Sequence, residues 1–203
     1  MKDKEIEIKF YVKNLTKVLE RLEQLGAKLV QPRTHEVNLR FDTPNGDLSR
    51  AFQVLRLRQD TAARLTFKGP ATGQGGARVR TELEFIVEDF DTAQAFLQAL
   101  GYQVILMYEK YRTIYDLHDV HVTLDEMPYG NFVELEGPDV RSLKAVNLKI
   151  GLNWEAGVPE SYSVLFDQLR RRLKFNFRDL SFENFTGLQV NADDLGVVAA
   201  DME

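Results

Sequence analysis

The chain has 203 residues, of which 44% are hydrophobic and 28% charged, and its formal net charge at pH 7 is −5. These values predict a globular protein with a sizeable core and argue against non-specific binding to nucleic acid. The absence of cysteine excludes disulfides, thiolate metal sites and cysteine nucleophiles. The charged start is unlike a signal peptide, and no apolar run reaches the roughly 18 to 20 residues of a membrane helix, so we expect a soluble, cytoplasmic protein without membrane contact.

The first predicted strand is Glu5-Ile6-Glu7-Ile8-Lys9, in which charged and apolar residues alternate. On a strand this period of two places Glu5, Glu7 and Lys9 on one face and the isoleucines on the other. Further strands with alternating residues are predicted over 37–41, 53–59, 64–68, 78–84, 108–116, 121–125 and 132–136. Residues 69–77 are too rich in glycine for a strand and predict a mobile hairpin loop.

Helices are predicted over about 15–26, 140–150 and 160–173, with Asn14, Asp139, and Ser161 or a neighbour of it as N-caps. The segment 7–26 also aligns without gaps to 82–101, an offset of 75, which predicts a duplicated strand–helix–strand unit. We assign residues 1–175 to one domain and residues 176–203 to a C-terminal extension. Its aromatic residues are expected to pack in part, and the segment beyond Asn191 is expected to be disordered.

The elements predict an α+β fold in which about eight antiparallel strands close into a β-barrel with flanking helices. Closure would turn the charged faces inward and remove the sheet edges. Sorted by sign, those faces carry an acidic set (Glu5, Glu7, Asp125, Glu134 and Glu136) and a basic set (Lys9, Arg56, Arg58, Lys68, Arg80, Lys110 and Arg112).

Inward cations need a compensating anion, because an unpaired buried charge costs several kcal/mol. A polyphosphate would satisfy the basic set through bidentate arginine contacts, and a hard divalent cation, Mg²⁺ or Mn²⁺, would satisfy the acids. The alternative is a solvated outer face with cross-strand salt bridges, which is the commoner meaning of such a pattern on a single strand. We assign Arg78, Glu84, Glu109 and Asp116 to that alternative, and base the case for a site on the sum of the strands.

The ordered motifs resemble those of the CYTH superfamily, the triphosphate tunnel metalloenzymes. They are Glu5-x-Glu7-x-Lys9, Leu55-Arg56-Leu57-Arg58, Thr66-Phe67-Lys68-Gly69, Arg80-Thr81-Glu82, Lys110-Tyr111-Arg112, Leu124-Asp125, Val133-Glu134-Leu135-Glu136 and Glu160-Ser161-Tyr162, covering residues 4–173. The resemblance implies a closed antiparallel barrel that holds a triphosphate. It also implies that the basic set binds phosphates, the acidic set binds metal, and Glu5, Glu7, Lys9 and Glu134 take part in catalysis. Glu82 matches a family acid, Lys174 is the nearest candidate for a lysine that completes some family sites, and related proteins are often dimers.

Two enzymatic functions follow from the resemblance. Attack of water on the terminal phosphorus gives a triphosphatase acting on tripolyphosphate, thiamine triphosphate or a nucleoside triphosphate. Attack of the ribose 3′-hydroxyl on the α-phosphorus gives a class IV adenylate cyclase. We favour hydrolysis, because water is always present whereas cyclisation needs a shaped adenosine pocket. A non-catalytic polyphosphate- or nucleotide-binding module is the third alternative, and the retained acids argue against it.

Overall fold

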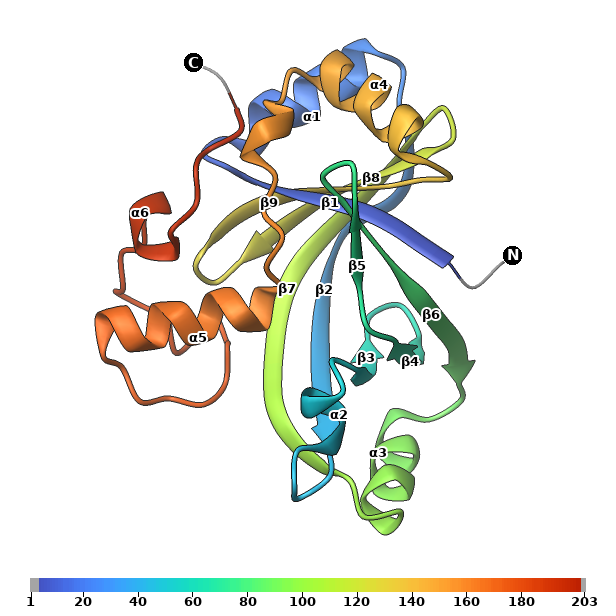
Figure 1. Ribbon diagram of the computed structural model, residues 1–203, viewed down its shortest axis with the longest axis vertical. Coiled ribbons are helices and arrows are strands. Elements are labelled where there is room, and N and C mark those ends of the chain that lie inside the picture. The colour runs from blue at the N-terminus through green and yellow to red at the C-terminus, as the bar shows by residue number, and fades with distance from the viewer. Residues whose placement is uncertain (1–3, 202–203) are drawn as a thin grey trace.

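A computed structural model describes residues 4–201, and its sheet closes into a ring of 8 antiparallel strands with the order β1-β9-β8-β7-β2-β3-β4-β6 (Figure 1). The strands are β1 Lys4–Val12, β2 Lys28–Asp42, β3 Val54–Gln59, β4 Ala63–Lys68, β5 Thr72–Gln74, β6 Ala77–Val87, β7 Gln103–Leu117, β8 Val120–Met127 and β9 Gly130–Glu136. The helices are α1 Leu15–Gln24, α2 Asp47–Arg50, α3 Phe90–Ala99, α4 Val140–Ile150, α5 Tyr162–Leu173 and α6 Ala192–Leu195, with a 3₁₀ turn, η1, at Trp154–Ala156. The predicted α+β barrel is confirmed.

The duplicated unit is visible in the element bounds. Adding 75 to the bounds of α1 and β2 gives those of α3 and β7, and the N-caps Asn14 and Asp89 are separated by the same number. Both helices stop before a glycine with positive φ, Gly26 and Gly101, a conformation that costs glycine little. The repeated strands also pair with each other, β1 with β6 and β2 with β7. The repeat therefore builds matching parts of the barrel wall.

The apolar core lies outside the ring, between the barrel wall and the helices that cover it. In Figure 1, α1 and α4 lie together over one end of the barrel, and α5 and α6 lie at its side. Phe10, Leu22 and Leu143 are fully buried in the cluster that includes α1 and α4. Phe166 and Leu180 are fully buried in a second cluster that includes α5 and the C-terminal segment. Burial of each large apolar side chain stabilises the fold by about 1.5 to 3 kcal/mol, so these clusters offset the cost of a polar interior.

Residues 69–77 form less of a loop than predicted. Thr72–Gln74 is a strand, β5, which pairs with Ala77–Val79 at the start of β6, and Gly75 and Gly76 reverse the chain with positive φ. The prediction of a loop was wrong here because it relied on the low strand propensity of glycine. The pairing of β5 with β6 uses backbone N–H and C=O groups, which glycine also supplies. The Gly75-Gly76 pair between the two strands is typical of the tight turn of a β-hairpin.

The C-terminal segment is packed through Asp201, so the predicted disorder beyond Asn191 is wrong for the described residues. Leu195 and Ala200 are buried, and the backbone N–H of Ala200 donates to the Tyr11 carbonyl over 2.8 Å. The Asp201 carboxylate accepts from the backbone N–H groups of Lys13 and Asn14, ahead of α1. Residues 202–203 and 1–3 lie outside the described part, and the domain boundary at residue 175 stays a prediction.

No helix within residues 4–201 is both long and apolar enough to cross a membrane. The predicted location of the protein is otherwise untested.

Candidate active site

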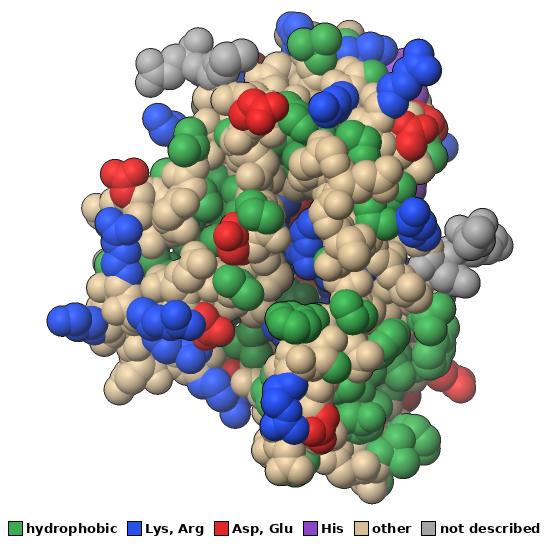
Figure 2. All heavy atoms as spheres, in the orientation of Figure 1, with side chains coloured by type: hydrophobic (Ala, Val, Ile, Leu, Met, Phe, Trp, Pro, Cys, Tyr) green, Lys and Arg blue, Asp and Glu red, His purple; other side chains and the backbone are tan. Residues whose placement is uncertain are grey.

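The ring encloses a cavity of about 1430 Å³. Figure 2 shows lysine and arginine side chains inside a hollow at the centre of one face of the molecule. All of the predicted cations line this cavity, together with four of the predicted acids: Lys9, Arg56, Arg58, Lys68, Arg80, Lys110 and Arg112, and Glu5, Glu7, Glu134 and Glu136. The alternation along each strand thus has the predicted result, because the charged faces turn inward.

Most of the cations and the predicted acids occupy different arcs of the wall, although Lys9 lies on the acidic arc and Glu82 and Glu84 lie on the basic one. The neighbouring strands β7, β2, β3, β4 and β6 each place at least one lysine or arginine at the cavity. The neighbouring strands β9 and β1 contribute the glutamates of the predicted acidic set, and β8 contributes Asp125 behind them. A long anion could therefore lie along one arc while a divalent cation lies between it and the other.

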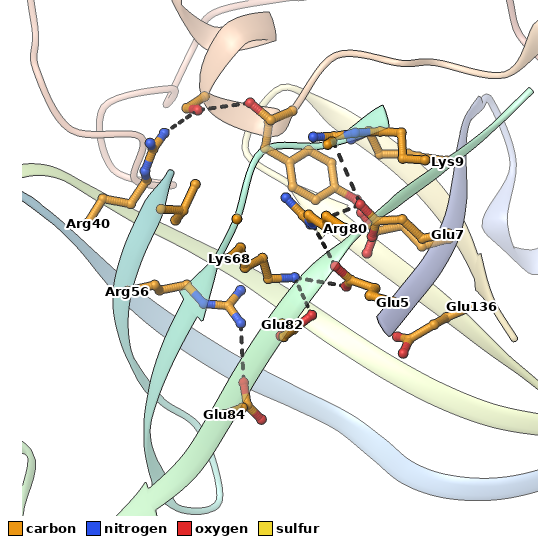
Figure 3. Close-up of a pocket in the computed structure, with 18 of the residues that line it drawn as sticks. Glu5, Glu7, Lys9, Arg40, Arg56, Lys68, Arg80, Glu82, Glu84 and Glu136 are labelled. Carbon is orange, nitrogen blue, oxygen red and sulfur yellow. Dashed lines mark hydrogen bonds and ion pairs between the residues drawn. The ribbon is translucent and has the colours of Figure 1, made fainter. Parts of the chain in front are cut away.

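Glu5 stands at the centre of one ion-pair cluster, drawn in Figure 3. Its carboxylate accepts from Lys68 Nζ over 2.8 Å and from Arg80 Nε over 2.6 Å. Arg80 also donates to Glu7 over 2.9 Å, and Lys68 lies 2.9 Å from Glu82. Burial opposes ionisation of Glu5, but Lys68 and Arg80 outweigh it and hold the pKa of Glu5 below its ordinary value.

Glu82 shows the opposite behaviour in the same cluster. Burial and the adjacent Glu5 raise the pKa of Glu82 to about 7, against the attraction of Lys68. Two carboxylates that share one lysine cannot both ionise easily, so Glu82 keeps its proton to a higher pH than an ordinary carboxyl group.

Asp125 organises the second cluster but does not line the cavity. It is fully buried and accepts from Lys110 Nζ over 2.9 Å, from Arg112 over 2.7 and 2.6 Å, and from the Tyr162 hydroxyl over 2.7 Å. Burial disfavours its charge, yet Arg112 and Lys110 keep the pKa of Asp125 well below its usual range. In this arrangement Asp125 holds two cations in place, and its predicted role as a metal ligand stays a prediction.

Glu134 connects this cluster to the cavity. It accepts from Arg112 Nη2 over 2.6 Å and lines the open space. Burial opposes its ionisation, but Arg112 outweighs that effect and keeps the pKa of Glu134 low. The carboxylate is therefore ionised at neutral pH and can accept a hydrogen bond.

Lys9 is the predicted cation with the weakest compensation. Its side chain is buried, its Nζ lies 4.3 Å from the centre of the Tyr162 ring, and within residues 4–201 no carboxylate oxygen comes within 4.0 Å of it. Burial lowers the pKa of Lys9 against the attraction of Glu134 and Glu7. An anion in the cavity would relieve this cost.

The interior contains more acid than the sequence predicted. Glu36 is 1% exposed and lies 3.7 to 3.9 Å from Lys110, Arg58 and Arg112. Glu84 lines the cavity and pairs with Arg58 over 3.0 Å and with Arg56 over 3.4 Å. Glu36 and Glu84 therefore pair with cations that were expected to need a polyphosphate. A triphosphate would replace existing ion pairs rather than fill an unpaired basic channel.

Two residues assigned to a solvated face, Arg78 and Glu84, in fact line the cavity. Glu109 and Asp116 pair instead with His35 and His121 outside the buried clusters. Sequence reasoning also omitted Arg40 and Tyr108 as site residues, although both line the cavity. The alternation of β2, in which Arg40 follows Asn38, already carried the signal for Arg40.

Lys174 is not brought to the site. It is an exposed residue at the C-terminal end of α5, whereas the opposite end of this helix, with Ser161, Tyr162 and Ser163, lines the cavity.

The residues present fit a hard divalent cation only in company with a ligand. Within residues 4–201, no three acidic or histidine side chains already converge to hold a metal ion. Glu136, however, pairs with no cation within 4.0 Å in the described chain, and burial together with Glu5 and Glu7 raises its pKa. Mg²⁺ is commonly held by one or two carboxylates plus phosphate oxygens and water, and the donors here are of that kind.

Comparisons with known proteins give one family. A model described as the CYTH domain matches residues 3–141. A provisionally named adenylate cyclase of Methanocaldococcus jannaschii is 29% identical over 147 residues, which are 71% of this chain and 81% of that protein. The adenylate cyclase CyaB of Aeromonas hydrophila is 28% identical over 177 residues, which are 81% of this chain and 89% of that protein.

Solved structures share the fold. A provisionally named adenylate cyclase of Vibrio parahaemolyticus has a TM-score of 0.71 at 24% identity, over 81% of this chain and 98% of its own. A Hippeastrum protein, described as a cyclase candidate with a dominant triphosphatase activity, has a TM-score of 0.63 at 18% identity, over 80% of this chain and 95% of its own.

Proposed function

This chain belongs to the CYTH family, and on that premise we propose that it is a divalent-metal-dependent triphosphatase whose reaction takes place inside the tunnel. The observation that carries the proposal is the cavity itself. Lysine and arginine side chains from the contiguous arc β7–β2–β3–β4–β6 face glutamates of β9 and β1 across it. A linear triphosphate has the length and charge to engage such an arc, and a compact monovalent anion does not.

Binding is proposed as an exchange of partners. Phosphate oxygens take the places that Glu5, Glu7 and Glu134 now occupy on Lys68, Arg80 and Arg112. Each charge-assisted hydrogen bond contributes about 1.5 to 3 kcal/mol where it replaces water, and less where it replaces a carboxylate. The released carboxylates, with Glu136, are the oxygen donors that would hold Mg²⁺ or Mn²⁺. Bound there, the metal would supply charge neutralisation and lower the pKa of coordinated water.

The chain's own residues then account for the chemistry. Water adds to the terminal phosphorus, the bond from that phosphorus to the bridging oxygen breaks, and orthophosphate and the shortened phosphate chain leave. Lys9 and the arginines stabilise the charge that develops on the transferred and leaving groups. Glu134, at the cavity surface and released from Arg112 by the phosphate, orients the water and accepts its proton.

Adenylate cyclisation is the second candidate, and the names of the relatives from Methanocaldococcus and Aeromonas favour it. In that reaction the ribose 3′-hydroxyl would attack the α-phosphorus and pyrophosphate would leave. Hydrolysis stays our preference, supported by the dominant triphosphatase activity described for the Hippeastrum protein of the same fold.

One product assay separates the candidates. The protein is incubated with ATP, tripolyphosphate and thiamine triphosphate, each with Mg²⁺ or Mn²⁺, and orthophosphate, pyrophosphate and cyclic AMP are resolved. We expect metal-dependent orthophosphate release. Cyclic AMP with pyrophosphate from ATP would establish the cyclase instead, and metal-independent binding without turnover would establish a non-catalytic module.

A matched pair of variants tests the site. Glu134→Gln is expected to lower turnover at least about 100-fold, because it removes the acceptor for the water proton. Glu88→Gln makes the same change at an exposed position away from the cavity and should retain wild-type turnover. Wild-type turnover by Glu134→Gln would refute the assignment of Glu134.

A further inference from the structure

Arg40 on β2 is a cavity-lining cation that lacks a charge partner. Within residues 4–201 no carboxylate oxygen lies within 4.0 Å of its guanidinium, and its buried Nε has no hydrogen-bond partner. Its Nη1 donates to Ser163 Oγ over 2.6 Å. Figure 3 shows Arg40 reaching from its strand toward the turn that carries this serine.

The residue directly opposite Arg40 makes this arrangement costly. In the β2–β3 register, Arg40 pairs with Arg56, and both side chains line the cavity. Like charges placed opposite each other on neighbouring strands are destabilising. Arg56 has only one carboxylate contact, at 3.4 Å to Glu84, and its other contacts are the neutral Thr66 and Tyr108. Asp42 and Asp167 attract Arg40, and Glu82 and Glu36 attract Arg56, but from longer range. Within residues 4–201 only Glu84 comes within 4.0 Å of either guanidinium, so close negative charge is sparse at this point of the wall.

Ser163 fixes the guanidinium in place without neutralising it. The serine lies in the first turn of α5, and its Oγ is 3.0 Å from Ser161 Oγ, so the hydroxyl is itself held. Only one of the guanidinium's N–H groups is used in this way, and the others remain as donors. A fixed fork of unused donors, facing a second guanidinium, suits an oxyanion such as a phosphate group.

We propose that Arg40 and Arg56 form a further phosphate subsite, at the end of the tunnel next to the first turn of α5. This inference rests on the proposed function, and it names Arg40 as the residue through which β2 would contact the phosphate chain. Arg40 would also fill a gap between β7 and β3, because among the lysines and arginines of β2 it is the one at the cavity.

The test is equilibrium binding of tripolyphosphate with EDTA present, so that no turnover occurs, measured by calorimetry. We expect Arg40→Gln to weaken binding roughly 10- to 100-fold, as expected for the loss of a charge-assisted hydrogen bond. Arg40→Lys should recover part of this loss, and Ser163→Ala should weaken binding by a few-fold. Arg141→Gln removes the same charge from an exposed site on α4 and should bind like the wild type.

Thermal unfolding of the ligand-free variants separates binding from a structural role. Removing Arg40 relieves its repulsion with Arg56, so Arg40→Gln should melt at the wild-type temperature or above it while binding less tightly. Wild-type affinity in Arg40→Gln, with tripolyphosphate still bound by the wild type, would overturn this inference alone. Failure of the wild type to bind tripolyphosphate, with EDTA or with Ca²⁺, would overturn the proposed function as well.

Discussion

Replacing Asp125 with asparagine tests whether this residue holds the wall together. Its carboxylate takes four hydrogen bonds, from Lys110, from two nitrogens of Arg112 and from Tyr162, and it is fully buried. Asparagine offers one acceptor oxygen and turns an amide N–H₂ toward one of the cations. Glu36 lies 3.7 Å from Lys110, but its Oε2 has no hydrogen-bond partner, so this contact does not replace the lost hydrogen bonds.

Breaking a buried ion pair by removing one partner costs about 3 to 5 kcal/mol. For a chain of this length, that loss lowers the melting temperature by roughly 6 to 20 °C. Urea unfolding at pH 7 should show the loss, and Asp91→Asn, an exposed substitution, should change the free energy of unfolding by less than about 1 kcal/mol.

The pH dependence follows from the direction of the pKa shift. Since the pKa of Asp125 is lowered in the folded protein, its stabilisation is complete above the unfolded value near 4 and is lost as pH falls further. The gap between wild type and Asp125→Asn should therefore narrow from pH 7 to pH 3. A variant as stable as the wild type at pH 7, but with weakened metal binding, would refute this reasoning and make Asp125 a metal ligand instead.

Two further perturbations probe other parts of the molecule. Because burial and Glu5 raise the pKa of Glu82 to about 7, the folded protein holds a proton there that the unfolded chain has lost, so stability should fall as pH rises from about 4.5 to 7. Glu82→Gln should remove this dependence of stability on pH, which calorimetric melting from pH 5 to pH 8 measures. An unchanged pH dependence in the variant would contradict the interaction of Glu82 with Glu5 and Lys68. Asp201→Ala should cost about 1 kcal/mol in urea unfolding, because its carboxylate accepts from the backbone of Lys13 and Asn14, and no loss would show that the tail contributes little.

The inward charged faces were predictable because strand alternation is local, and Glu5, Glu7 and Lys9 show it within five residues. Glu36 was predictable in the same way, because it alternates with Val37 in step with Asn38 and Arg40, and the expected strand began one residue too late. What local patterns could not predict is that the segment before it is also a strand. The first half of β2 contains Pro32 and register shifts at Leu29/Gln31 and Gln31/Thr34, and its pairing with β7 keeps it extended where its own pattern does not alternate. Propensity and period fail where a distant strand determines the conformation.

The remaining omissions have the same physical origin. Asp201 binds backbone groups 187 and 188 residues earlier in the chain, so no local pattern could predict that the tail is ordered. Asp125 shares the alternation of the acids, but only the positions of Arg112 and Tyr162 show that it faces a protein partner. Sequence patterns fixed which face a residue occupies, and tertiary contacts decided whether that residue meets solvent, ligand or another charge.

The strands and segments that pair with β1 all follow it at a long distance in the sequence, so they are synthesised well after it. β1 pairs with β6 and β9, and beyond these its edge meets Gly157 through Phe10 and Ala199 through Tyr11. During synthesis, therefore, the edges of β1 stay unpaired until segments as far as almost the whole chain length away have been made. Closures over such long separations make folding slow and leave strand edges exposed meanwhile. The alternating charges that suit the finished tunnel would also keep this early strand from pairing with other chains while it waits.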